Sequence, residues 1–208
     1  MLAETPRAVV EKPRAADTDA VAQLVAAARG CFARDGVRRT RMAAVAQAAG
    51  MVRQTVYAFV SSREELIELA LAARLPELIP AIVERSGTDH PTVEDAFVDV
   101  FVTMAAVVRE DPEFVEYAEA LGLARALRFL TGDTAAQDVV IEIVRPHYER
   151  AESEGLLRPG ISLADVAFWS RTVLAPPALR ADVDDAELRR VLRKFALPAL
   201  LTAGRAGA

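Results

Sequence analysis

The sequence is poor in the residues on which several classes of protein depend. It contains a single cysteine, Cys31, which excludes an internal disulfide and a zinc site built from several thiolates. The two histidines, His90 and His147, are far apart and lack the spacing of zinc ligands. No apolar run reaches the roughly 18 residues that span a bilayer, and the N-terminus lacks the apolar segment of a signal peptide. We therefore expect a cytoplasmic protein without a metal site.

Glycine, proline and aromatic residues are also too scarce for a turn-rich β-sandwich. The 208 residues include 10 glycines and 11 prolines, aromatic residues make up 6%, and hydrophobic residues make up 52%. Such a chain is long enough for a core and too apolar to be disordered. It has neither a glycine-rich phosphate loop nor a G-x-S-x-G sequence, so an enzyme is not expected and no cofactor is predicted. The composition indicates an all-α fold.

Charge is distributed unevenly along the chain. The formal net charge is −5 at pH 7, yet residues 34–63 carry six arginines against one acidic residue, Asp35. Residues 67–208 carry 15 basic and 23 acidic residues. A basic segment in an acidic protein is typical of nucleic-acid binding, although arginines on solvated helices give the same composition.

Apolar residues recur at helical spacing along most of the chain, except in residues 1–17, which we interpret as a flexible arm. Thr40 is expected to cap the second helix, and Ser61 with Glu64 to form a capping box for the fourth. Prolines are expected to interrupt, bend or end helices at positions 76, 80, 146, 176, 177 and 198. The expected helices cover residues 18–35, 41–49, 53–60, 62–73, 92–110, 112–121, 124–130, 133–154, 162–175 and 184–201.

The first three expected helices, which span the basic segment, have the lengths and the tight turn of a helix-turn-helix. Gly50 permits the turn between the second and third helices, and Arg53, Gln54 and Thr55 open the third. In this motif the third helix enters the major groove. Charge and geometry therefore both indicate a DNA-binding domain over residues 18–64.

Several short motifs follow one another in this region: CFARDG at the end of the first helix, VAQAAG at the turn, and TVYAFVSSREEL across the third and fourth helices. Over about residues 18–75 the chain resembles the N-terminal domain of the TetR family of bacterial transcriptional regulators. The resemblance implies a homodimeric, ligand-responsive repressor that binds a pseudo-palindromic operator, with residues 65–208 as a helical ligand-binding and dimerisation domain. The chain departs from the family pattern at Val52, Ala58 and Phe59. These departures leave an alternative: a helical interaction or scaffold protein with a degenerate helix-turn-helix that does not bind DNA.

Within positions 18–64, seven residues are candidate DNA contacts. Arg41, Arg53 and Gln54 suit base edges, where bidentate hydrogen bonds discriminate between base pairs. Four others suit phosphate contacts: Thr40, Thr55, Tyr57 and Arg63. In the alternative interpretation Tyr57 is a core aromatic with a hydrated hydroxyl and Arg63 is a surface residue.

In residues 65–208, aromatic and polar side chains within apolar runs are candidate ligand contacts. The candidates are Phe97, Phe101, Met104, Phe114, Tyr117, His147 and Trp169, each of which is alternatively ordinary core. They predict an apolar or amphipathic small-molecule effector. The last two expected helices are apolar on more than one face, which a monomer cannot cover, so we expect a homodimer.

Overall fold

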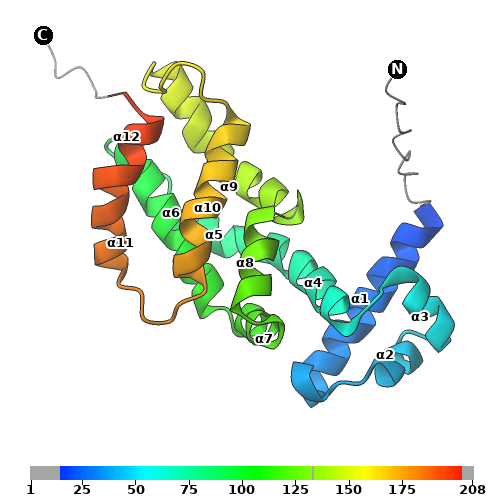
Figure 1. The fold of residues 1–208 in the computed structure, drawn as a ribbon. Helices are drawn as coiled ribbons and strands as arrows, with labels where there is room; N and C mark the ends of the chain where they lie inside the picture. The colour runs from blue at the N-terminus through cyan, green and yellow to red at the C-terminus, as the bar shows by residue number, and fades with distance from the viewer. Residues whose placement is uncertain (1–14, 133, 203–208) are drawn as a thin grey trace, which may run out of the picture. The chain divides into compact units, whose positions relative to one another are not determined.

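Helices make up most of the chain that the structure describes, and the predicted all-α fold is confirmed (Figure 1). The structure is a computed structural model that describes residues 15–132 and 134–202, so the predicted arm over 1–17 lies almost entirely outside it. Two 3₁₀ segments, η1 and η2, and one π-helical segment, η3, accompany the α-helices. The elements are α1 (Ala15–Asp35), η1 (Val37–Arg39), α2 (Met42–Ala48), α3 (Arg53–Phe59), α4 (Arg63–Arg74), η2 (Leu75–Leu78), α5 (Ile79–Ser86), α6 (Val93–Glu110), α7 (Pro112–Leu121), α8 (Leu123–Gly132), α9 (Thr134–Ser153), α10 (Leu163–Ala178), α11 (Asp185–Val191), η3 (Leu192–Ala196) and α12 (Leu197–Leu200).

The helices group into two compact units, Met1–Leu66 and Ile67–Ala208, and α4 crosses the boundary between them. None of the helices in residues 15–132 and 134–202 combines the length and apolar character needed to cross a bilayer.

The first unit is built on α1, which packs against η1 and α2. Its buried side chains come from every helix of the unit: Leu24, Ala28, Phe32, Val37, Val45, Val56 and Val60. The Gln23 amide of α1 also donates a hydrogen bond of 3.0 Å to the carbonyl oxygen of Ala49, in the turn after α2. Gly50 follows with a φ of 65°, a conformation that glycine adopts without strain. Core packing and this hydrogen bond together fix where α3 begins.

The caps of α2 and α4 differ from the sequence predictions. The residue before α2 is Arg41, which makes no side-chain cap, whereas the Thr40 hydroxyl is buried and lies 2.9 Å from the carbonyl oxygen of Gly36. At α4 the cap is shifted by one residue from the predicted Ser61–Glu64 pair. The Ser62 hydroxyl accepts a hydrogen bond from the Glu65 backbone N–H, and the Glu65 carboxylate accepts one from the Ser61 N–H. The sequence Ser-Ser-Arg-Glu-Glu offers both registers, and the glutamate that can reach back is the second.

The second unit is centred on α6, which packs against α5, α9, α10 and α11. Twelve of its 18 residues are buried, so α6 is surrounded by other helices on most of its circumference. Thr92, at the predicted start of this helix, caps it by accepting a hydrogen bond of 3.0 Å from the Asp95 N–H. The predicted break at Gly122, between α7 and α8, is also present.

A proline follows the end of one helix, and prolines lie inside two others, α9 at Pro146 and α10 at Pro176 and Pro177. The helix α4 ends at Arg74, before Pro76, as predicted, and Pro76 and Pro80 each lie in the first turn of a new element, η2 and α5 respectively, where a missing N–H removes no bond. The predicted stop at Pro176–Pro177 is wrong, because α10 continues to Ala178. The two lost donors lie in the last turn, where the carbonyl group of exposed Thr172 can be hydrated. Near Pro198 the chain stays helical through the π-helical segment η3.

Two bidentate ion pairs fasten the C-terminal part of α4 within the second unit. The Arg125 guanidinium of α8 binds both oxygens of Glu68 at 2.6 and 3.0 Å. The Arg74 guanidinium binds both oxygens of Asp111, at the junction of α6 and α7, at 3.1 and 2.5 Å. Bidentate geometry fixes orientation as well as distance, so these pairs set the position of α4 against α7 and α8.

Candidate nucleic-acid interface and apolar cavity

One face of α3 is exposed and polar. Arg53, Gln54, Tyr57 and Ala58 are exposed along it, at the spacing that places residues on one side of a helix, while Val56 is buried on the other side. Tyr57 is 41% exposed, and the Arg53 guanidinium lies 5.4 Å from the centre of its ring, within the range of a cation–π contact. The contact places the guanidinium against the exposed ring of Tyr57.

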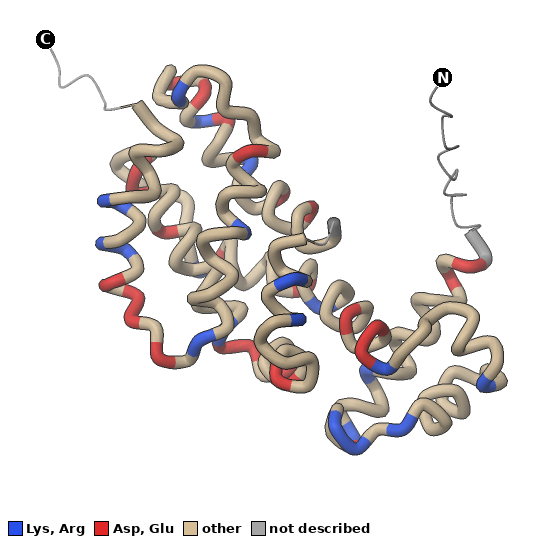
Figure 2. The backbone as a smooth tube through the Cα atoms, in the orientation of Figure 1, with Lys and Arg blue, Asp and Glu red and all other residues tan. Residues whose placement is uncertain are grey.

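Arginines from η1, α3, α4 and the position before α2 surround a shallow hollow beside this face. It is lined by Arg38, Arg39, Thr40, Arg41, Met42, Ala43, Arg53, Tyr57 and Arg63. In Figure 2 the basic positions of the first unit are concentrated between the end of α1 and the start of α2. Five arginines in one open hollow, with no acidic residue in its lining, form a positive surface of the kind that phosphate groups bind.

The predicted DNA-contact residues do not all have equal access to a partner. Thr40 is 5% exposed, and its hydroxyl lies within hydrogen-bonding distance of the carbonyl oxygens of Cys31 and Gly36, so it has no proton directed at solvent. The Arg63 guanidinium donates to the carbonyl oxygen of Val37, which ties α4 to η1 while leaving its charge at the hollow. Thr55 is half-buried on α3 and does not line the hollow.

Arg38 and Arg39 belong to the hollow although neither is among the seven predicted contacts. Arg39 is held by a hydrogen bond of 2.6 Å to the carbonyl oxygen of Asp35, and Arg38 is exposed. The three basic residues around Thr40 could have indicated this hollow in the sequence. Because they lie between two helices, helical periodicity does not predict where their side chains point.

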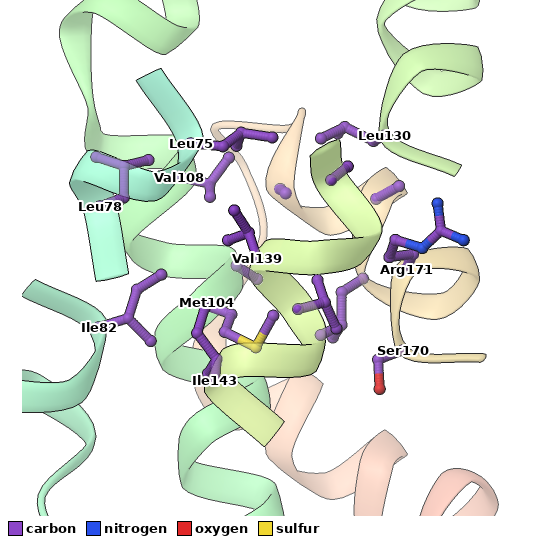
Figure 3. A pocket seen from close by; sticks show the side chains of 16 residues that line it. Leu75, Leu78, Ile82, Met104, Val108, Leu130, Val139, Ile143, Ser170 and Arg171 are labelled. Carbon is purple, nitrogen blue, oxygen red and sulfur yellow. The ribbon is translucent and has the colours of Figure 1, made fainter. Parts of the chain in front are cut away.

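The second unit contains an apolar cavity of about 60 Å³ (Figure 3). Side chains from η2, α5, α6, α8, α9 and α10 form its wall: Leu75, Leu78, Ile82, Met104, Ala105, Val108, Leu130, Ala136, Val139, Val140, Ile143, Ser170, Arg171, Leu174, Ala175 and Ala178. Two of these residues, Leu75 and Leu78, directly follow α4, so a change in the cavity wall is adjacent to the helix that crosses the unit boundary.

Of the seven predicted ligand contacts, only Met104 lines this cavity. Four others pack together as an aromatic cluster, in which Phe97 lies 5.5 Å from Phe101 and 6.0 Å from His147, and Phe101 lies 6.0 Å from Trp169. Burial lowers the pKa of His147 to about 4, with the charges of His90 and Arg150 adding to the effect. The imidazole is therefore neutral at pH 7 and packs as an aromatic ring.

The two remaining candidates, Phe114 and Tyr117, are buried in α7. Phe114 borders a separate surface groove with Arg109 and Leu123, and the Tyr117 hydroxyl donates to the Glu113 carboxylate at 2.6 Å. Sequence reasoning missed the aliphatic cavity wall, because leucine, valine and alanine at helical spacing have the same pattern whether they enclose a void or fill it.

Residues 24–70 match the family model described as bacterial regulatory proteins, tetR family. The matched segment contains α2, α3, the turn between them and most of α4. Comparison with the curated proteins gives no match.

Solved structures with the same fold include two regulators of this family. The transcriptional repressor QsdR from R. erythropolis, of the TetR family, has a TM-score of 0.63 and 15% identity, covering 90% of this chain and 99% of its own. A chain described as a TetR-family transcriptional regulator from Mesorhizobium loti MAFF303099 has a TM-score of 0.51 and 19% identity, covering 91% of this chain and 100% of its own. Residues 24–70 thus match the N-terminal domain of the TetR family, and the chain has the overall fold of these solved TetR-family regulators.

Proposed function

We propose that the protein is a non-enzymatic transcriptional repressor of the cytoplasm that binds a pseudo-palindromic DNA operator as a homodimer and releases it when a small molecule binds the second unit. The observation that carries this proposal is the position of the arginine-lined hollow beside the exposed face of α3. The same helix-turn-helix thus presents both phosphate-binding and base-reading side chains.

The residues around the hollow fall into two groups, according to whether they can reach base edges or phosphates. Arg53 and Gln54 begin α3 and are exposed, so they are assigned to base edges, where each bidentate pair discriminates by about 1–3 kcal/mol. Tyr57 and the arginines at positions 38, 39, 41 and 63 are assigned to phosphates. Thr40 is withdrawn from the contacts, because its hydroxyl proton is directed at backbone carbonyl oxygens.

DNA binding is tested by titrating the protein with duplexes selected from a random-sequence pool, at several salt concentrations. Neutralising about four phosphates per subunit gives a log–log salt slope below −3 even for one subunit, at roughly −0.9 per phosphate. Tyr57→Ala is expected to weaken binding to all duplexes alike, and Gln54→Ala to relax the preference at one base position. Arg180→Ala is the matched control, since Arg180 is exposed in the second unit and pairs with Asp182. Absence of duplex binding at low salt would favour the alternative of a helical interaction protein.

Dimerisation is proposed through the C-terminal helices. Phe168 on α10 is 60% exposed and Phe195 on η3 is 65% exposed, although both belong to helices whose other faces are buried in the unit. Large aromatic residues exposed on two helical segments of one unit are typical of an interface with a second copy. Two-fold symmetry then pairs two copies of α3, and adjacent major grooves require them about 34–36 Å apart.

The proposed switch acts through the wall of the cavity. A ligand larger than about 60 Å³ that is to be enclosed by the wall must move it, and the wall includes Leu75 and Leu78 of η2, the segment that follows α4. The Arg74–Asp111 and Glu68–Arg125 pairs connect α4 to α7 and α8, so displacement of these helices is transmitted to α4. A tenfold loss of operator affinity requires about 1.4 kcal/mol of coupling. Operator titration with and without a bound ligand measures this coupling.

A further inference from the structure

We propose that the cavity binds a neutral, nonpolar small molecule, and that it excludes ligands whose charged group must enter it. The inference refines the effector of the proposed repressor and rests on that function. Its basis is that none of the polar atoms of the residues lining the cavity is directed into it.

Ser170 is one of the two polar residues of the wall. Its hydroxyl lies 2.6 Å from the carbonyl oxygen of Val166, one turn earlier in α10, and the residue is fully buried. Figure 3 shows this hydroxyl pointing away from the apolar side chains of the cavity. Because the hydroxyl proton is used within the helix, Ser170 offers a ligand no donor without breaking that hydrogen bond.

Arg171 is the other polar residue of the wall. It is buried, and its guanidinium donates a hydrogen bond of 3.0 Å to the side-chain oxygen of Gln137 on α9. In Figure 3 the guanidinium is turned away from the cavity, so the part of Arg171 that lines the wall is its aliphatic stem. A carboxylate among the other wall residues would therefore lose its hydration without gaining a hydrogen bond. We expect a neutral ligand to bind at least roughly a hundredfold more tightly than its carboxylate analogue of the same shape.

The volume sets the size of probe that enters. An apolar cavity of about 150 Å³ binds benzene or xenon and stays dry, whereas this one is about 60 Å³. Xenon is therefore expected to enter with little change, and benzene to be fully enclosed only with movement of flexible wall residues such as Met104 and Leu130. Binding of benzene is thus expected to shift resonances of wall residues in more than one helix.

The experiment measures binding to the full chain without DNA. Methyl resonances are followed during titration with xenon, benzene and benzoate, and operator binding is titrated separately with each. Xenon and benzene are expected to shift wall methyls saturably, and benzoate is expected to leave them unchanged at a hundredfold higher concentration.

Two variants reduce the cavity from different helices. Ala175→Val on α10 and Ala136→Val on α9 add methyl groups to its wall, and each is expected to weaken benzene binding at least tenfold while the chain remains folded. The matched control is Ala167→Val, at a buried position of α10 that does not line the cavity, which is expected to retain benzene binding. Having two cavity variants keeps the test open if one of them does not fold.

The outcomes separate the inference from the proposed function. Benzoate binding as tight as benzene, absence of xenon and benzene binding, or undiminished binding in both cavity variants would each overturn the inference, whatever the protein does with DNA. Selective benzene binding that leaves operator affinity unchanged would uphold the inference while refuting the ligand response of the proposed repressor.

Discussion

Replacement of Asp111 tests how firmly α4 is held in the second unit. Asp111 is 9% exposed and performs two tasks with one carboxylate. It caps α7 by accepting a hydrogen bond of 2.8 Å from the Phe114 N–H, and it binds the Arg74 guanidinium in bidentate geometry. Burial opposes its ionisation, but the hydrogen bonds from Arg74 and from the Phe114 backbone outweigh burial and lower its pKa. The carboxylate is therefore ionised and stabilising at pH 7.

The expected cost follows from these two tasks. Loss of an N-cap costs about 1 kcal/mol, and a charge-assisted hydrogen bond contributes about 1.5–3 kcal/mol. Arg74 retains Glu77 at 2.7 Å and is 24% exposed, so the ion-pair contribution belongs at the lower end of that range. Asp111→Ala is thus expected to destabilise the second unit by about 2–4 kcal/mol. Asp111→Asn keeps the cap and loses the charge, and about 1–2 kcal/mol is expected.

Urea denaturation followed by fluorescence of the single tryptophan, Trp169, reports on the second unit. The control is Asp182→Asn, because Asp182 also forms a bidentate pair, with Arg180, but at an exposed position where no measurable loss is expected. Since the pKa of Asp111 is lowered, its contribution is present above its ordinary value of about 3.8 and is lost as the pH falls through its lowered value. An Asn variant as unstable as the Ala variant, or an Ala variant within about 0.5 kcal/mol of the wild type, would refute this account of Asp111.

Three further changes probe other parts of the molecule. Because burial lowers the pKa of His147 to about 4, protonation favours the unfolded state, and the free energy of unfolding of the wild type should fall by about 2 kcal/mol between pH 7.5 and pH 5. Urea titrations of His147→Phe should show a smaller fall, and an equal fall would contradict this account. Gly50→Ala places alanine at a φ of 65°, although the new methyl group meets no neighbouring atom, so the first unit should lose about 1–2 kcal/mol of stability in thermal unfolding. An unchanged unfolding midpoint would contradict this expectation. Phe195→Glu should convert a dimer to a monomer of 22.4 kDa in sedimentation, whereas Val83→Glu, at another exposed apolar position, should not.

The order and type of the helices could be predicted from the sequence, because apolar periodicity, glycine stops and capping residues agree along the chain. The helix-turn-helix was predictable for the same reason, since Gly50 and the buried positions of α2 and α3 fix its geometry locally. Details that depend on a choice between two equivalent neighbouring residues could not be predicted. Ser61 and Ser62 both suit a cap, and only the position of the Glu65 side chain decides between them.

The position of the apolar cavity could not be predicted from the sequence. Phe97 and Phe101 were reasonable candidates, but two aromatic rings that meet His147 and Trp169 fill the space that they would otherwise line. A cavity arises where facing side chains are too small to meet across the gap, as Ala105, Ala136 and Ala175 are here, and facing positions are a property of the tertiary structure alone.

The passage of α4 across the unit boundary decides where regulators with this architecture can be recombined. A fragment that ends at Leu66 retains only Arg63–Leu66 of a 12-residue helix, and so short a piece of helix does not persist in water. Leu75 begins a 3₁₀ segment and Pro76 already breaks the hydrogen-bond ladder. Chimaeras that join this helix-turn-helix unit to a foreign second unit should therefore keep the chain through Arg74 and be spliced in η2, with the partners of Glu68 and Arg74 carried over as Arg125 and Asp111.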